Sequence, residues 1–154
     1  MRFNPPFPLL SKIKRLSAII CITIASLFSL FIEIGLSHEL KIVVNPENPI
    51  SIISKKELTQ IYLRKKGFSN DGMALVPMDF RANKMDFYEG VLNKPFPLIK
   101  RYWTRAIFSG KGTPPKEFRD LDRMLRSLKE MPGGLAYVPA NSELKNLKVL
   151  KIVP

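Results

Sequence analysis

Short apolar runs separated by polar turns predict the strands of this 154-residue chain. Residues 40–44 (LKIVV) are apolar and largely β-branched, which is typical of a strand, and the two prolines within residues 45–49 (NPENP) end it. Similar runs predict three further strands at residues 74–80, 134–138 and 147–153. The predicted strands are therefore spread along the whole of residues 38–154.

Between these strands, apolar residues recur at the three- and four-residue spacing of half-buried helices. The first helix is expected to begin at Ser54, which forms a capping box with Glu57, and to end at Gly67. Three more are expected at about residues 83–92, 95–110 and 116–131. Their inward-facing residues are expected to include Phe87 and Tyr88, then Leu98, Trp103 and Ile107, then Phe118 and Leu125. Helices that alternate with strands in a chain of this size predict an α/β fold with a mixed central sheet flanked by helices.

The first 37 residues have the pattern of an export signal. Four cations in residues 2–15 precede an uncharged apolar run at residues 16–32, and residues 35–37 (GLS) place small side chains at a cleavage site. The run of 17 residues is short for a membrane span, which needs about 20. We therefore expect a signal peptide at residues 1–37, one domain at residues 38–154 and a periplasmic location. A retained membrane anchor is the alternative.

The residues that remain after position 37 exclude several kinds of catalytic site. Cys21, the single cysteine, lies inside the expected signal, and His38, the single histidine, would become the first residue. A serine or cysteine nucleophile would lack its usual base, and neither a disulfide nor a cysteine metal site can form. We expect no enzyme activity, no cofactor and no metal site.

Three carboxylates near the middle of the chain, Asp79, Asp86 and Glu89, could be drawn as a cluster. The simpler interpretation is one carboxylate at a helix start, Asp86, together with surface charges.

The formal net charge of the chain is +12, and much of it lies in residues 94–129, where ten Lys and Arg face three acidic residues. A basic face of this kind suits phosphate, anionic lipid or nucleic acid, while solvated helix faces are the simpler explanation. An exported protein rarely meets nucleic acid, and the aromatic and basic residues are not interleaved as in single-strand binders. We expect no nucleic-acid partner.

Residues 76–92 (VPMDFRANKMDFYEGVL) hold the main candidate site. The pattern predicts a strand that runs through a short turn into a helix, with Asn83 as the cap and with Arg81 and Lys84 on either side of the first turn. The unpaired N–H groups of a helix start, next to cations and at the carboxyl end of a strand, can bind an anion. An ordinary helix start with solvated charges is the alternative.

A second candidate is Lys111, in residues 109–113 (SGKGT). The glycines and the lysine resemble a phosphate cradle, but the spacing and the preceding strand of a nucleotide-binding P-loop are missing. A plain loop between helices is the simpler interpretation, and Lys111 is kept as a secondary anion contact.

Four segments taken together resemble the phosphate-transporter substrate-binding-protein-like family, small exported relatives of periplasmic phosphate-binding proteins. They are NPENPISIISKKELTQIYLRKKGFSNDG, VPMDFRANKMDFYEGVL, YWTRAIFSGKGTPPKEF and MPGGLAYVPA, which occur in this order between about residues 44 and 140. The resemblance implies one lobe of a type II periplasmic-binding-protein-like fold. Full-size members close two such lobes over an oxyanion, and this chain is long enough for about one.

The resemblance also implies a role for the residues after the strand at 74–80. In phosphate binders of this family, the matching lobe has an Arg at the strand end, followed by Ser-Gly-Thr at the start of a helix, and both bind the anion. Arg81 falls on the Arg position, whereas Ala82, Asn83, Lys84 and Met85 replace the Ser-Gly-Thr in a shorter turn. Asn83 can donate from its amide, and Lys84 can add a point charge.

Two functions are compatible with these features. In the first, a monomeric, exported solute-binding-type protein binds phosphate or a similar oxyanion weakly through Arg81, Asn83 and Lys84, with Lys111 as a further contact. It would serve an inner-membrane transporter or sensor complex. In the second, a ligand-free accessory module docks on a membrane complex through the basic helices of residues 94–129. Direct association with anionic lipid is a third idea.

Overall fold

The computed structural model describes residues 39–144 and 146–154, which belong to one unit of the chain, His38–Pro154. The signal peptide and cleavage site expected at residues 1–37 lie outside the described residues.

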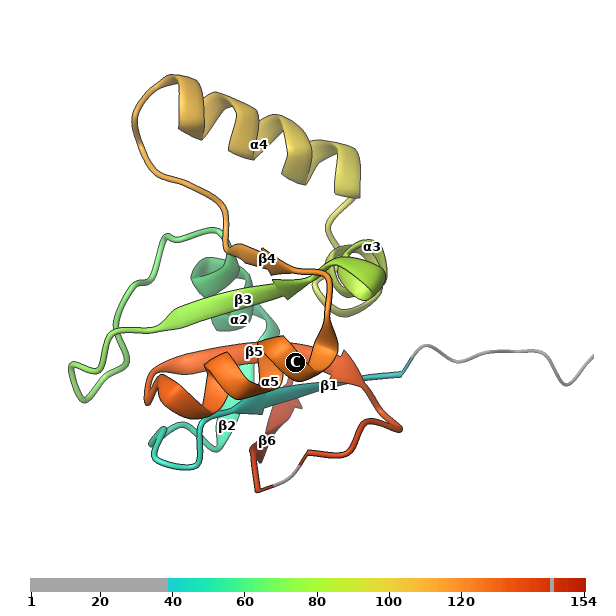
Figure 1. Ribbon diagram of the computed structural model, residues 1–154. Coiled ribbons are helices and arrows are strands. Elements are labelled where there is room, and N and C mark those ends of the chain that lie inside the picture. The colour runs from blue at the N-terminus through green and yellow to red at the C-terminus, as the bar shows by residue number, and fades with distance from the viewer. Residues whose placement is uncertain (1–38, 145) are drawn as a thin grey trace, which may run out of the picture. The chain divides into compact units, whose positions relative to one another are not determined.

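Six strands form a mixed sheet in this unit (Figure 1), in the order β2-β6-β1-β5-β3-β4. They are β1 (Leu40–Val44), β2 (Ile52–Ser54), β3 (Val76–Phe80), β4 (Lys116–Phe118), β5 (Gly134–Pro139) and β6 (Lys148–Val153). β1 runs antiparallel to both β5 and β6, whereas β3 runs parallel to β5 and β4, and β2 parallel to β6. The predicted α/β class, the mixed sheet and all four predicted strands are confirmed, while β2 and β4 were not predicted.

The helices are α2 (Lys55–Tyr62), α3 (Lys84–Asp86), α4 (Phe96–Phe108) and α5 (Leu121–Glu130). α2 begins as predicted, because the Ser54 hydroxyl accepts a hydrogen bond from the Glu57 amide at 3.1 Å. Its expected end at Gly67 is wrong, since the helix stops at Tyr62. α2 and α5 lie on opposite faces of the sheet (Figure 1).

The segment expected to form one helix at residues 116–131 contains both a strand and a helix. Residues 116–118 pair with β3 as β4, and the Asp120 carboxylate then caps α5 by accepting a 2.7 Å hydrogen bond from the Arg123 amide. The prediction placed Phe118 on a helix, which is wrong, but its side chain is buried as expected.

The core between α2 and the sheet is rich in aromatic side chains. Phe87 stacks on Tyr137 of β5 with ring centres 3.9 Å apart, and Tyr62 of α2 packs at 4.5 Å from Phe87. The backbone that carries Phe87 is irregular: a 3₁₀ turn at Arg81–Asn83 leads into α3 and then into a π turn at Phe87–Val91. These turns hold the predicted inward-facing Phe87 and Tyr88 in the core.

α4 lies beyond β4, at the edge of the sheet (Figure 1). Its Ile99, Trp103 and Ala106 are buried, and the Tyr102 hydroxyl ties it to the end of α2 through a 2.8 Å hydrogen bond to the Leu63 carbonyl. Leu98 and Ile107 were expected on the buried side, which is wrong, because each is about half exposed. A helix at a sheet edge buries only a narrow stripe, and this exposure leaves apolar surface beside the candidate site.

Candidate anion-binding site

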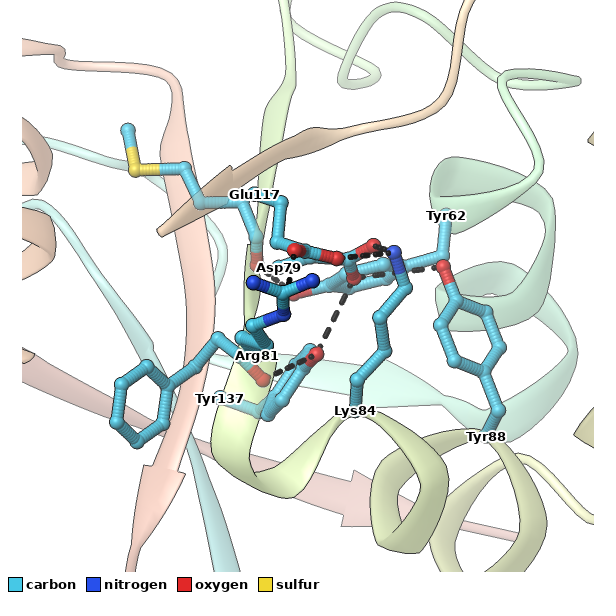
Figure 2. Close-up of polar contacts among 9 residues, drawn as sticks. Tyr62, Asp79, Arg81, Lys84, Tyr88, Glu117 and Tyr137 are labelled. Atoms are coloured by element: carbon cyan, nitrogen blue, oxygen red, sulfur yellow. Dashed lines mark hydrogen bonds and ion pairs between the residues drawn. The ribbon is translucent and has the colours of Figure 1, made fainter. Parts of the chain in front are cut away.

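The site is built around Asp79, a fully buried carboxylate near the end of β3. Its Oδ1 accepts hydrogen bonds from the hydroxyls of Tyr137 at 3.2 Å and Tyr88 at 3.4 Å, and its Oδ2 lies 2.8 Å from the Lys84 ammonium (Figure 2). A buried carboxylate needs such partners because the desolvation of a lone charge is very costly.

Sheet register places a second carboxylate beside the first. Because β3 and β4 pair in parallel, Asp79 is aligned with Glu117 across the two strands. Two negative charges in this relationship repel one another. The ammonium of Lys84 bridges them, donating to Glu117 Oε2 at 3.0 Å while it contacts Asp79 (Figure 2). Lys84 therefore neutralises a like-charge pair created by the fold.

Arg81 completes a chain of four alternating charges. Its Nε lies 3.2 Å from Glu117 Oε1, so the order from the core outwards is Asp79, Lys84, Glu117 and Arg81. The exposed fraction of the side chain rises along this chain from 0% to 19%, 35% and 55%. The guanidinium is thus the member of the chain most open to solvent.

Burial and charge pairing set the protonation of the inner groups. Burial raises the pKa of Asp79, and the contacts with Lys84 only partly oppose this effect. Burial lowers the pKa of Lys84, but its contacts with Asp79 and Glu117 outweigh that effect and raise the pKa above its ordinary value. Lys84 therefore stays charged near neutral pH.

Burial, followed by the nearby charge of Asp79, also raises the pKa of Tyr62, Tyr88 and Tyr137. Their hydroxyls therefore remain neutral, and two of them act as donors to Asp79.

A cleft of about 580 Å³ opens beside Arg81, between the turn after β3 and the inner side of α4. Charged groups on its lining include Arg81, Lys84, Lys100 and Glu117. Its apolar lining includes Met85, Phe96, Ile99, Trp103 and Ile107. The exposed Arg81 side chain accordingly lines a hollow whose surface carries both charged and apolar side chains.

The structure brings together two of the four residues predicted to contact an anion. Arg81 and Lys84 share Glu117 and both line the cleft. Asn83 occupies the N-cap position of α3, as predicted, but its side chain is buried and makes no capping hydrogen bond. Lys111 is exposed in the loop after α4 and is not part of the cleft lining. Anion contact by these residues stays a prediction.

The sequence analysis did not predict the two carboxylates of the network, Asp79 and Glu117. The interpretation of Asp79 as a surface charge is wrong, because its side chain is fully buried, and Glu117 was placed on a helix. One signal was present: Asp79 stands in a strand that the pattern marked as apolar, five residues before Lys84. A charge in such a strand requires a partner of opposite sign, and Lys84 is a near neighbour.

Solved structures with the same fold include receptors for phosphate transport. An ABC-type phosphate transport receptor from Vibrio cholerae matches with a TM-score of 0.55 at 13% identity, over 73% of this chain and 45% of the receptor. PstS from Borrelia burgdorferi matches with a TM-score of 0.56 at 14% identity, over 73% of this chain and 46% of PstS. Over 73% of its length, this chain shares its fold with parts of these two receptors. The fold that the family resemblance implied is therefore confirmed in the structure.

A third structure with the same fold was solved with a bound ligand. A protein from Clostridium perfringens, assigned to the phosphate ABC transporter substrate-binding proteins and solved with bound phosphate, has a TM-score of 0.56 at 9% identity, over 73% of this chain and 44% of that protein. This chain spans less than half the length of all three neighbours. No protein-family model and no curated protein sequence matches this chain.

Two further findings concern the described residues alone. In residues 39–144 and 146–154, no helix has the length and apolar character required to cross a membrane. The same residues contain no group of three or more His, Cys, Asp or Glu side chains arranged to hold a metal ion.

Proposed function

We propose that this chain is an exported solute-binding-type protein that binds phosphate or a similar oxyanion weakly, at the corner formed by Arg81. The observation that supports this most is an accessible guanidinium at the carboxyl end of β3, on the rim of a cleft. The pairing with Glu117 involves Nε, and a guanidinium has five N–H donors, so donors remain for a ligand. Phosphate recognition commonly uses two such donors at once.

Three features argue for weak binding. Glu117 lies on the same rim and repels an incoming anion, while Lys84 already serves Asp79 and Glu117. The chain also corresponds to less than half of each receptor that shares its fold. Without closure by a second lobe, water competes for every hydrogen bond to the ligand.

The setting of this function is inferred from the sequence and from the neighbours. The export pattern of residues 1–37 supports a periplasmic protein with a cleaved signal. The neighbours named as ABC-type transport receptors suggest an inner-membrane transporter or sensor as the partner of a monomeric binding protein. Neither a cofactor nor an enzymatic reaction is part of this proposal.

A second candidate function is a ligand-free accessory module that docks on a membrane complex. The exposed surface of α4 favours it: Phe108 is 88% exposed, and Leu98 and Ile107 are about half exposed. α4 also carries Lys100, Arg101 and Arg105 but no acidic residue. Exposed apolar side chains among cations are a common feature of contact surfaces.

Thermal unfolding with added anions separates the two candidates. A ligand stabilises the folded state by RT ln(1 + [L]/Kd), which reaches about 2.7 kcal/mol at 100 Kd. Phosphate and sulfate are compared with chloride at equal ionic strength, because salt alone changes stability. We expect phosphate to raise the melting temperature of the wild type and of Arg126→Ala, an exposed arginine on α5, but not of Arg81→Ala. The absence of any specific rise in the wild type would favour the accessory module.

A further inference from the structure

A second cleft, of about 500 Å³, lies between α2 and the segment that leads into α4. Four lysines line it: Lys55, Lys56, Lys65 and Lys94. The remaining lining residues are Thr59, Gln60, Leu63, Leu92 and Asn93, so no carboxylate is present in the lining. A hollow with four cations and no anion differs sharply from the Arg81 cleft, where Glu117 is part of the wall.

The four lysines are not compensated by nearby acidic groups. None of them forms an ion pair within residues 39–144 and 146–154. The acidic residue in the first turn of α2, Glu57, is bonded instead to Lys66 at 2.5 Å. Lys65 lies over the ring of Tyr102, 5.8 Å from its centre. The positive charge of this cleft is therefore open to a ligand.

Two of the lysines occupy an unfavourable place. Lys55 and Lys56 are the first two residues of α2, at the end where unpaired N–H groups already create a positive potential. Cations at that end oppose the helix dipole. An anion in the cleft would relieve this effect.

Backbone hydrogen bonds fix the walls that carry the other two lysines. The amide of Lys65 donates to the Gln60 carbonyl at 2.8 Å, and the amide of Lys94 donates to the Tyr88 carbonyl at 2.8 Å. The Tyr102 hydroxyl ties α4 to Leu63 in the cleft wall. The backbone of both walls is thus held by hydrogen bonds, and the exposed lysine side chains extend from it.

We propose that this cleft binds an anion that carries two or more adjacent phosphate groups, at a site separate from Arg81. Four lysine charges around a hollow of this size match a multivalent anion better than a single phosphate. Lysine ammonium groups act as point charges toward phosphate oxygens and need no fixed ligand geometry. Thr59, Gln60 and Asn93 add polar side chains to the wall. Soluble polyphosphate and phosphate-rich lipid headgroups share this chemistry.

Calorimetric titration with tripolyphosphate at low ionic strength tests the site. The variant Lys56→Gln/Lys94→Gln removes one charge from each wall. Lys129→Gln/Lys151→Gln removes the same charge from exposed positions that do not line the cleft. We expect the first variant to weaken binding about tenfold or more and the second by less than about twofold. Arg81→Ala should bind tripolyphosphate like the wild type, which separates this site from the proposed oxyanion site.

Sedimentation with vesicles distinguishes the two sources of phosphate. Vesicles of phosphatidylcholine with and without cardiolipin, which has two phosphates in one headgroup, are compared using the same variants. Lysine-dependent binding to tripolyphosphate alone identifies a soluble anion, and binding to both probes identifies a headgroup that the site accepts. The proposal is overturned if the wild type binds neither probe, or if the two double variants lose affinity equally. Circular dichroism and melting curves confirm that each variant is folded.

Discussion

The ammonium of Lys84 lies 2.8 Å from the fully buried carboxylate of Asp79 and 3.0 Å from Glu117 (Figure 2). Asp79 and Glu117 are aligned on neighbouring parallel strands, so the lysine stands between two carboxylates that the sheet itself brings together. The contact fixes the outer carboxylate, and the outer carboxylate in turn contacts Arg81. Stability of the sheet edge and the position of the exposed guanidinium therefore depend on the same side chain.

Replacement of Lys84 by Met should destabilise the protein by about 3 kcal/mol, because it leaves Asp79 buried without its cation. Urea unfolding at pH 7 measures this change. The double variant Asp79→Asn/Lys84→Met should lose less than the sum of the two single variants, since the groups interact directly. A free energy of unfolding for Lys84→Met within about 0.5 kcal/mol of the wild type would contradict the role assigned to the pair.

The pKa of Asp79 gives a pH dependence with a definite sign. Because burial raises this pKa in the folded state, the folded protein holds a proton that the unfolded chain has already released at the same pH. The window begins at the ordinary aspartate pKa of about 4 and extends upward to the raised value. Across it, this group stabilises the folded state more as the pH falls.

The contribution of Asp79 is isolated by comparison with Asp79→Asn, which has no proton to bind at this position. Denaturant unfolding of both proteins between pH 4 and 7 should show the wild type gaining stability relative to the variant as the pH is lowered. A relative gain on raising the pH would mean that pairing with Lys84 dominates over burial.

Gly133 allows β5 to approach β3. A Cβ atom at this position would lie 1.8 Å from the Ala74 carbonyl oxygen, a backbone atom that cannot move aside, and the Gly133 carbonyl accepts the Val76 amide at 2.9 Å. Gly133→Ala should therefore cost at least about 3 kcal/mol or prevent folding. Gly67→Ala is the matched control, because an added Cβ there meets no atom within 4 Å. Similar melting temperatures for the two variants would contradict this account of the strand contact.

In the lysine cleft, a substitution that raises the stability of the unliganded protein is expected to weaken the binding of tripolyphosphate. Lys56→Glu places an anion in the first turn of α2, where it should stabilise the unliganded protein by about 0.3–1 kcal/mol while it weakens tripolyphosphate binding. Lys129→Glu makes the same change in the last turn of α5, where a cation is favourable, so it should destabilise by a similar amount and leave binding intact. Unfolding curves and titrations of both variants check the four expected signs. Loss of stability in Lys56→Glu would contradict the view that the cations are held there at a cost.

The elements that were predicted correctly are those with a strong local signal. LKIVV at β1 and the Ser54 cap of α2 depend on neighbouring residues, and the structure keeps both. β4 was missed because Phe118 also falls at helical spacing from the apolar residues of α5, and a three-residue strand adds little signal of its own. The pairing with β3 decides its conformation, and that contact is distant in sequence.

In the candidate site, too, the residues that could be predicted are those with a local signal in the sequence. Arg81 and Lys84 could be found because strand end, turn and cations are adjacent in the sequence. Glu117 could not, because only the parallel register of β3 and β4 places it beside Asp79. The exposure of Leu98 and Ile107 could not be predicted either. Helical spacing shows an apolar stripe but does not show how much of it the sheet edge covers.

The central proposal is that an oxyanion binds at the corner of Arg81, and NMR detects weak binding there most directly. Phosphate is titrated into ¹⁵N-labelled protein at constant ionic strength, and the amide signals of residues 81–85 are followed in the wild type and in Arg81→Ala. We expect these signals to shift and saturate with a Kd of about 1 mM or weaker in the wild type only. If the signals of residues 81–85 do not move, or move equally in the variant, the proposed oxyanion site is wrong.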